Sequence, residues 1–179
     1  MDEPVGFREF VVARSPALLR TAWMLTGDAK AAEDLLQTAL ARTWPHWERI
    51  SDGRPEAYVR RVLVRTHASW LSRRWRGERP TADVVAGVAA GRDTGRDDHA
   101  STDDRLMLAA ALAGLPLRQR QAVVLRYFDD LAVEAVAELM GSSPGTVKSQ
   151  SAKGLAKLRS ALRAEEPSHP HPDLDEVER

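Results

Sequence analysis

Apolar side chains recur every three or four residues through residues 7–75, which is the spacing of amphipathic helices. Turn residues interrupt the pattern at positions 26–28 and 51–55, and Asp28 is a candidate N-cap for the helix that follows it. The stripes consist of Leu18, Ala22 and Leu25, then Leu36, Leu40, Thr43 and Trp47, and finally the apolar positions of residues 58–75. All five tryptophans fall in this block, so it can build a compact helical core.

The helical pattern stops after Pro80. Glycines at 87, 91 and 95 then alternate with Ala, Asp and Arg, and no apolar face persists, which predicts a flexible linker. A coil of this length could hold two domains well apart. Helical periodicity returns from residue 105 and predicts four further helices, over residues 106–115, from Pro116 onward, over 131–140 and over 144–162.

The predicted fold class is therefore all-α, with two helical domains joined by a flexible linker. The first domain spans residues 1–76, the linker residues 77–104 and the second domain residues 105–163. Residues 164–179 are acidic and rich in proline, which is typical of a disordered tail.

Charge is strongly segregated along the chain, although 26 basic residues balance 26 acidic ones. Residues 54–79 hold eight arginines against two glutamates, and residues 105–163 hold nine basic against four acidic residues. Each basic block is followed by an acidic stretch. Because a partner responds to the local field rather than to the net charge, this pattern favours a nucleic-acid partner.

Candidate catalytic chemistry is sparse. The chain has no cysteine, no glycine-rich phosphate loop, and neither an HExxH nor a GxSxG motif. Its histidines form no ligand cluster except His169 and His171, which fall in the predicted tail. We therefore expect no enzyme activity, no metal, no cofactor and no small-molecule substrate. With no apolar run of about 18 residues, and no basic start followed by an apolar core, we expect a cytoplasmic protein without membrane insertion.

The strongest local signal is a helix-turn-helix pattern over residues 131–162. Ala137, Gly141 and Val147 stand where this motif needs a small residue at the helix crossing, a turn residue that tolerates positive φ, and an apolar residue that packs back. Ser142 or Ser143 can cap the second helix. An ordinary amphipathic hairpin is the alternative for this segment alone.

The second helix of this motif has one apolar sector and one polar sector. The apolar sector holds Val147, Ser151, Gly154, Leu155, Leu158 and Leu162, and we expect it to be buried. The polar sector holds Thr146, Ser149, Gln150, Lys153 and Lys157, with Lys148 and Arg159 on its far flank. Hydrogen-bonding side chains bordered by cations suit a helix in the DNA major groove.

The last helix of the first domain separates apolar and cationic faces in the same way. Val59, Leu63, Thr66 and Trp70 share one face, and Arg61, Arg65, Ser69, Ser72 and Arg76 share another. Trp75 falls beside the arginines, where an indole can stack on an unpaired base or simply cover the core. A solvated face is the alternative for the arginines. The preceding helix carries Glu33, Asp34, Gln37, Arg42 and Trp44 outside its apolar stripe, which suits either a protein partner or an ordinary exposed face.

Five segments together resemble the extracytoplasmic-function group of bacterial sigma-70 factors, and in particular its sigma-E-like branch. They are TAWMLTGDAKAAEDLLQTALARTW at 21–44, EAYVRRVLV at 56–64, WRGERPTAD at 75–83, LPLRQRQAVVLRYFDDL at 115–131 and GTVKSQSAKGLAKLR at 145–159. The resemblance implies a promoter-specificity subunit that binds core RNA polymerase and promoter DNA, with a region 2-like first domain and a region 4-like second domain. Many relatives are held inactive by an anti-sigma protein, so such a partner is implied as well.

The resemblance also implies residue roles. Polymerase binding would fall to Asp34, Leu35, Gln37, Leu40 and Trp44. Contacts to the −10 element would come from Arg60, Arg61, Arg65, Ser69, Arg73, Trp75 and Arg76. Contacts to the −35 element would come from Ser143, Thr146, Lys148, Ser149, Gln150, Lys153 and Lys157.

Four positions depart from the pattern of the group. Arg65 and Ser69 stand where many relatives carry Asn, Gln150 stands where the wider group often has Arg, and Ala132 replaces a helix-capping Ser. Two other functions remain open from the residues alone. One is a stand-alone helix-turn-helix regulator that does not need polymerase, and the other is a helical adaptor that binds acidic proteins.

Overall fold

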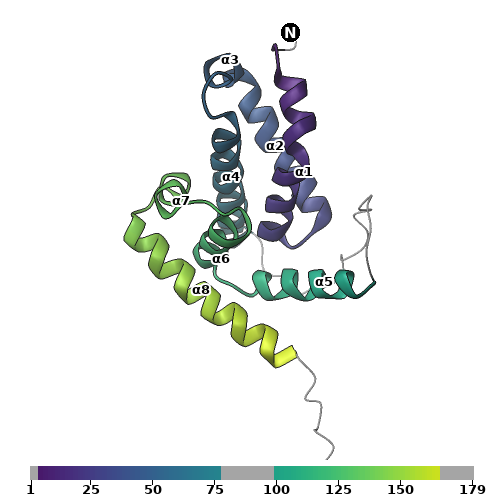
Figure 1. The fold of residues 1–179 in the computed structure, drawn as a ribbon, viewed down its shortest axis with the longest axis vertical. Helices are drawn as coiled ribbons and strands as arrows, with labels where there is room; N and C mark the ends of the chain where they lie inside the picture. Colours follow the sequence, from purple (N-terminus) through teal and green to yellow (C-terminus); the bar gives the residue numbers. More distant parts are fainter. Residues whose placement is uncertain (1–3, 78–98, 166–179) are drawn as a thin grey trace, which may run out of the picture.

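The computed structural model describes residues 4–77 and 99–165, and every regular element in these two ranges is helical (Figure 1). The elements are, in chain order, α1 (Phe7–Thr26), α2 (Ala29–Thr43), the 3-10 turn η1 (Trp44–His46), α3 (Trp47–Ile50), α4 (Pro55–Gly77), α5 (His99–Ala113), α6 (Leu117–Val123), the π-helical turn η2 (Val124–Phe128), α7 (Val133–Met140) and α8 (Pro144–Glu165). None of the helices in these ranges has the length and apolar character needed to span a bilayer.

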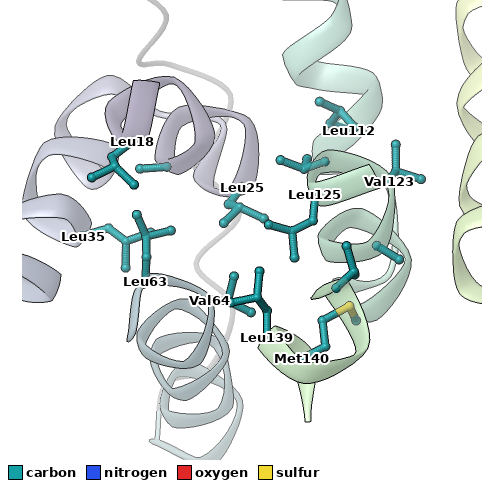
Figure 2. Packing of buried hydrophobic residues seen from close by; sticks show 14 of the residues in the cluster. Leu18, Leu25, Leu35, Leu63, Val64, Leu112, Val123, Leu125, Leu139 and Met140 are labelled. Carbon is teal, nitrogen blue, oxygen red and sulfur yellow. The ribbon is translucent and has the colours of Figure 1, made fainter. Parts of the chain in front are cut away.

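The first domain is a bundle in which α2 packs against both α1 and α4. Gly27 ends α1 with φ of 75°, a conformation that glycine adopts without steric cost. Asp28 then caps α2 by accepting a hydrogen bond from the backbone N–H of Ala31 at 2.7 Å, as the sequence predicts. The core of the bundle is built on Leu18, Leu35 and Leu63, which point toward one another in Figure 2.

The second domain contains the helix-turn-helix pair α7 and α8, which pack on each other, and α8 also packs on α6. Gly141 forms the turn with φ of 60°, and its left-handed conformation confirms the role expected of that glycine. Ser143 is the capping serine, because its Oγ accepts the backbone N–H of Thr146 at 3.1 Å. Four residues of the expected apolar sector of α8 are buried, namely Val147, Ser151, Gly154 and Leu158, whereas Leu155 and Leu162 are half-buried.

Several helix bounds differ from the sequence-based expectations. α5 begins at His99, so residues 99–104, which we expected in the linker, are helical. α7 begins at Val133 rather than at residue 131. The π-helical turn η2 ends at Phe128, and Asp130 has a left-handed backbone conformation that interrupts the helical path before α7. The rest of the expected linker (residues 78–98) and most of the expected tail (residues 166–179) lie outside the described residues.

The two domains pack directly on each other, although the linker would allow them to lie apart. Figure 2 shows Leu25 at the end of α1 facing Leu125 of η2, and Val64 of α4 close to Leu139 of α7. All four side chains are buried. Gln121 of α6 adds a hydrogen bond from Nε2 to the backbone oxygen of Val64 at 3.1 Å. A single apolar cluster therefore runs through both domains.

Gly154 lets α8 approach α6 closely. A β-carbon at this position would lie 2.7 Å from Cγ2 of Val123 and 3.1 Å from the backbone oxygen of Gln119, which is closer than carbon atoms pack. Gly145, in the first turn of the same helix, has only the Ser143 hydroxyl within 4 Å of such a carbon, at 3.9 Å.

We expect Gly154→Ala to destabilise the protein by about 1–3 kcal/mol, because the added methyl group overfills a packed contact. Chemical denaturation followed by circular dichroism measures this change. Gly145→Ala is the matched control, and it should leave stability unchanged or raise it by up to about 1 kcal/mol. Equal effects of the two substitutions would contradict the close approach at Gly154.

A second prediction concerns the uncapped start of α7. Ala132 occupies the N-cap position with an extended backbone and offers no side-chain acceptor. Ala132→Ser should stabilise the protein by about 1 kcal/mol, since the new hydroxyl can accept a free N–H of the first turn. Ala132→Val, which adds bulk without an acceptor, should give no such gain in the same denaturation experiment.

Candidate nucleic-acid interface

The polar sector of α8 faces solvent along its whole length. Thr146, Lys148, Ser149, Lys153 and Lys157 are exposed, and Gln150 is half-buried. The first carboxylate of α8 is its last residue, Glu165, so no acidic side chain opposes a phosphate backbone along the stripe itself. The helix therefore offers hydrogen-bonding and cationic groups on one continuous stripe.

Ser143 has a structural role at the start of that stripe. Its Oγ caps α8 and also lies 2.9 Å from the Oγ1 of Thr146, where either hydroxyl could donate. This hydrogen bond fixes the first turn of α8 and therefore the position of Thr146. The N-terminal turn is the part of a recognition helix that contacts base edges in the major groove.

The long helix α4 has the face separation expected from its sequence. Val59, Leu63 and Thr66 are buried against the bundle, whereas Arg65, Ser69 and Arg73 are exposed. The Arg73 guanidinium lies over the preceding turn, with NH2 at 3.3 Å from the Ser69 hydroxyl and Nε at 3.4 Å from the Ser69 backbone oxygen. The backbone of Trp75 and Arg76 continues α4, but their side chains lie outside the described part of the structure.

Arg60 and Arg61 differ from the other candidate cations, because each is paired with a carboxylate of the second domain. The Arg60 side chain is only 14% exposed, with its NH2 2.8 Å from Glu56 and its Nε 3.3 Å from Asp129. Arg61 forms an ion pair with Glu138 of α7. In this structure neither arginine is free to pair with a phosphate. This corrects the expectation, based on the run of arginines in the sequence, that both would be available for DNA.

Asp129 is the most buried acid of this contact, with a side chain that is 9% exposed. The hydroxyl of Thr21 donates to its Oδ1 at 2.7 Å, which ties it to α1. Burial raises the pKa of Asp129, while the Thr21 hydrogen bond and the positive charge of Arg60 act in the opposite direction. The carboxylate thus joins α1, α4 and η2 at one point, a role that no local sequence signal reveals.

The exposed face of α2 carries the candidate protein-binding residues, with one exception. Asp34 and Gln37 are exposed, and Leu40 and Trp44 are half-buried beside Phe7 in a shallow apolar depression. The Phe7 and Trp44 rings meet edge to face, 4.8 Å apart, which orients the indole.

Leu35 is the exception and corrects the expected set. It is fully buried between Leu18 and Leu63 (Figure 2), so it cannot contact a partner at the surface. Both Leu35 and Leu36 are buried because α2 packs against two helices, which makes its apolar face wider than a single stripe.

This geometry defines a two-domain helical DNA-binding protein with a helix-turn-helix in its second domain. Residues 10–77 match the family model of Sigma-70 region 2, and residues 105–158 match that of Sigma-70, region 4. The chain belongs to the sigma-70 family of RNA polymerase sigma factors, in its extracytoplasmic-function group.

Curated relatives match over most of the chain. An RNA polymerase sigma-E factor of Streptomyces coelicolor is 42% identical over 165 residues, covering 92% of this chain and 90% of that protein. The ECF RNA polymerase sigma factor SigL of Mycobacterium tuberculosis is 31% identical over 156 residues, covering 82% of each.

Solved structures share the fold. The sigma factor RpoE, crystallised in complex with the anti-sigma factor NepR from Bartonella quintana, has a TM-score of 0.71 at 23% identity, covering 89% of this chain and 98% of that one. CnrH, in complex with the cytosolic domain of CnrY, has a TM-score of 0.61 at 19% identity, covering 89% of this chain and 88% of that one.

A buried histidine on α4 is expected to make the stability of the protein depend on pH. His67 is buried, and its Nδ1 has no hydrogen-bond partner. Burial first, and then the positive charge of Arg120, lower the pKa of His67 from 6.5 to about 4. The unfolded chain takes up this proton more readily than the folded one, so the stability linked to His67 is present above pH 6.5 and is lost toward pH 4.

We expect acidification over this window to remove up to about 3 kcal/mol of unfolding free energy through His67. His67→Gln should flatten the pH dependence of stability, measured by urea denaturation at each pH. His46→Gln is the control for loss of an imidazole at the surface. A His67→Gln profile parallel to that of the parent protein would contradict the assignment.

Proposed function

We propose that this protein binds core RNA polymerase and directs it to begin transcription at particular promoters, acting in the cytoplasm without a cofactor and without catalysing a reaction itself. The proposal rests on one observation, which is that a single chain contains both DNA-contacting elements. One is the exposed polar stripe of α8, in the segment that matches Sigma-70, region 4, and the other is the basic helix α4, in the segment that matches Sigma-70 region 2. The names of its curated relatives, RNA polymerase sigma factors, support it.

In this proposal α8 binds the −35 element in the major groove. Gln150 is long enough to pair with both edge groups of an adenine, whereas Lys153 and Lys157 can reach phosphates. Thr146, Lys148 and Ser149 complete the contact surface, and Ser143 contributes through the cap that sets the first turn of α8. The exposure of this stripe supports the assignment.

The −10 element is assigned to α4. Its exposed residues Arg65, Ser69 and Arg73 can contact the backbone, and Trp75 and Arg76 extend the same helix. Opening DNA costs a few kcal/mol in lost stacking and pairing. Stacking of an unpaired base on an aromatic ring contributes about 1–3 kcal/mol of binding free energy, and cationic contacts to the exposed strand add to this contribution. The binding energy can therefore supply the opening without a chemical step.

Polymerase binding is assigned to the α2 surface of Asp34, Gln37, Leu40 and Trp44. Half-buried apolar groups rimmed by polar ones are typical of a protein interface. An anti-sigma protein is a further proposed partner, because the structural neighbours RpoE and CnrH were solved in complexes that include NepR and CnrY.

The test is run-off transcription of genomic fragments with purified core polymerase, with and without this chain. We expect the chain to bind core polymerase and to produce a discrete set of start sites, whose mapping would give the promoter sequences. Failure to co-purify with core polymerase at low salt would overturn the proposal. Tight binding of the second domain to a palindromic operator without polymerase would identify a stand-alone regulator instead.

Substitutions should separate the surfaces. Gln150→Ala and Lys153→Ala should lower transcription from a mapped promoter about five- to a hundredfold by loss of a base or phosphate contact, while polymerase affinity stays unchanged. Asp34→Ala and Leu40→Ala should weaken polymerase binding, measured by fluorescence anisotropy, without changing start-site choice. Ala110→Ser, exposed on α5 and outside α2, α4 and α8, is the control. Equal loss of polymerase affinity in all four variants would contradict this division.

A further inference from the structure

Among the described residues, two ion pairs cross between the domains, and both use arginines of α4. Asp129, which follows η2, contacts Arg60, and Glu138 of α7 contacts Arg61. The two arginines stand one residue apart on the helix assigned to the −10 element. The acids come from the second domain, so each pair can exist only when the domains are closed on each other.

The ion pairs lie beside the buried apolar contact between the domains. Leu25 and Val64 of the first domain pack near Leu125 and Leu139 of the second, and Arg120 of α6 donates from NH1 to the Leu25 backbone oxygen at 2.7 Å. Neither the pairs nor this hydrogen bond is formed by residues adjacent in sequence. The closed arrangement is thus specified by several independent contacts.

The other two functional surfaces remain open in the same arrangement. The α8 stripe is exposed, and so are Asp34 and Gln37 on α2. Closure therefore acts on α4 selectively, since it places carboxylates where the phosphates of a −10 strand would otherwise pair with Arg60 and Arg61.

We propose that the free chain is closed, and that Asp129 and Glu138 block single-stranded DNA from Arg60 and Arg61 until the domains separate. The closure follows from the structure alone, and the link to −10 DNA rests on the proposed function. Each carboxylate neutralises a guanidinium and repels an approaching phosphate, so contact of a single strand with both Arg60 and Arg61 requires both pairs to break.

The test uses variants of the full chain that alter Glu138, which is 72% exposed and can change without disturbing the core. Glu138→Lys should repel Arg61 and open the domains. Glu134→Lys is the matched control, because it adds the same charge to the same helix at an exposed position one turn away. Asp129→Asn keeps a side chain that can accept from Thr21 while removing the charge that faces Arg60.

Opening is measured directly by energy transfer between two dyes. The chain has no cysteine, so Asp52→Cys and Ala156→Cys, both at exposed positions, give one labelling site in each domain. We expect lower transfer efficiency for Glu138→Lys and Asp129→Asn than for the parent chain and Glu134→Lys. Equal efficiency in all four would show that the two ion pairs do not hold the domains together, and would overturn that part of the proposal whatever transcription assays show.

Blocking is measured by the affinity for fluorescein-labelled oligothymidylate. Glu138→Lys should bind it about two- to fivefold more tightly than Glu134→Lys, the range set by an exposed ion pair. Affinity of the two variants for a mapped −35 duplex should stay equal, because α8 is open in both states. A drop in energy transfer without this gain for single strands would overturn the blocking role.

A charge exchange completes the design. Arg61→Glu combined with Glu138→Lys restores opposite charges across the contact, so energy transfer should return toward the parent value while oligothymidylate binding stays weak. If the exchanged pair stays as open as Glu138→Lys alone, the Arg61–Glu138 pair does not hold the domains together.

Discussion

The apolar contact between the two domains is the constraint on which this structure depends. Small helical domains bury a modest share of their surface when they stand alone. Here Leu25 and Val64 of the first domain share a continuous buried cluster with Leu125 and Leu139 of the second. Separation would return these four side chains to water, so an open chain needs either a compensating partner or a favourable charge change at the contact.

The polar groups around this contact determine which domain faces meet. The Asp129 carboxylate receives the Thr21 hydroxyl from α1 and lies against the Arg60 guanidinium from α4. Apolar packing by itself tolerates rotation of one domain against the other, whereas a largely buried carboxylate such as Asp129 must keep its partners to avoid an unpaired charge. The burial that raises the pKa of Asp129 is the desolvation cost of this arrangement.

Much of the fold could be predicted from local pattern. The caps at Asp28 and Ser143, the turn at Gly141 and the two faces of α8 follow from residue types at fixed offsets, because local hydrogen bonds and a 3.6-residue repeat determine them. The start of α5 and the π-helical turn at residues 124–128 were missed, since neither carries a distinctive capping or turn residue.

The surfaces were less predictable, since a periodic pattern shows which face of a helix is apolar but not how many neighbours cover it. Leu35 was assigned to a partner surface although α2 is covered on two sides. Arg60 and Arg61 were counted as open cations because Asp129 and Glu138, which pair with them from the second domain, lie far away in the sequence. Tertiary contact, rather than composition, decides the state of such groups.

The close approach at Gly154 also limits how the DNA-contacting helix can be oriented. Successive residues of a helix are 100° apart around its axis, so even a modest roll of α8 would turn the Gln150 side chain away from a base edge. Val123 and the Gln119 backbone oxygen occupy the space that a β-carbon at residue 154 would need, so α8 packs on α6 in this orientation only because residue 154 is glycine. A glycine at this helix contact thus sets the orientation of Gln150, which lies one turn away on a neighbouring part of the helix surface.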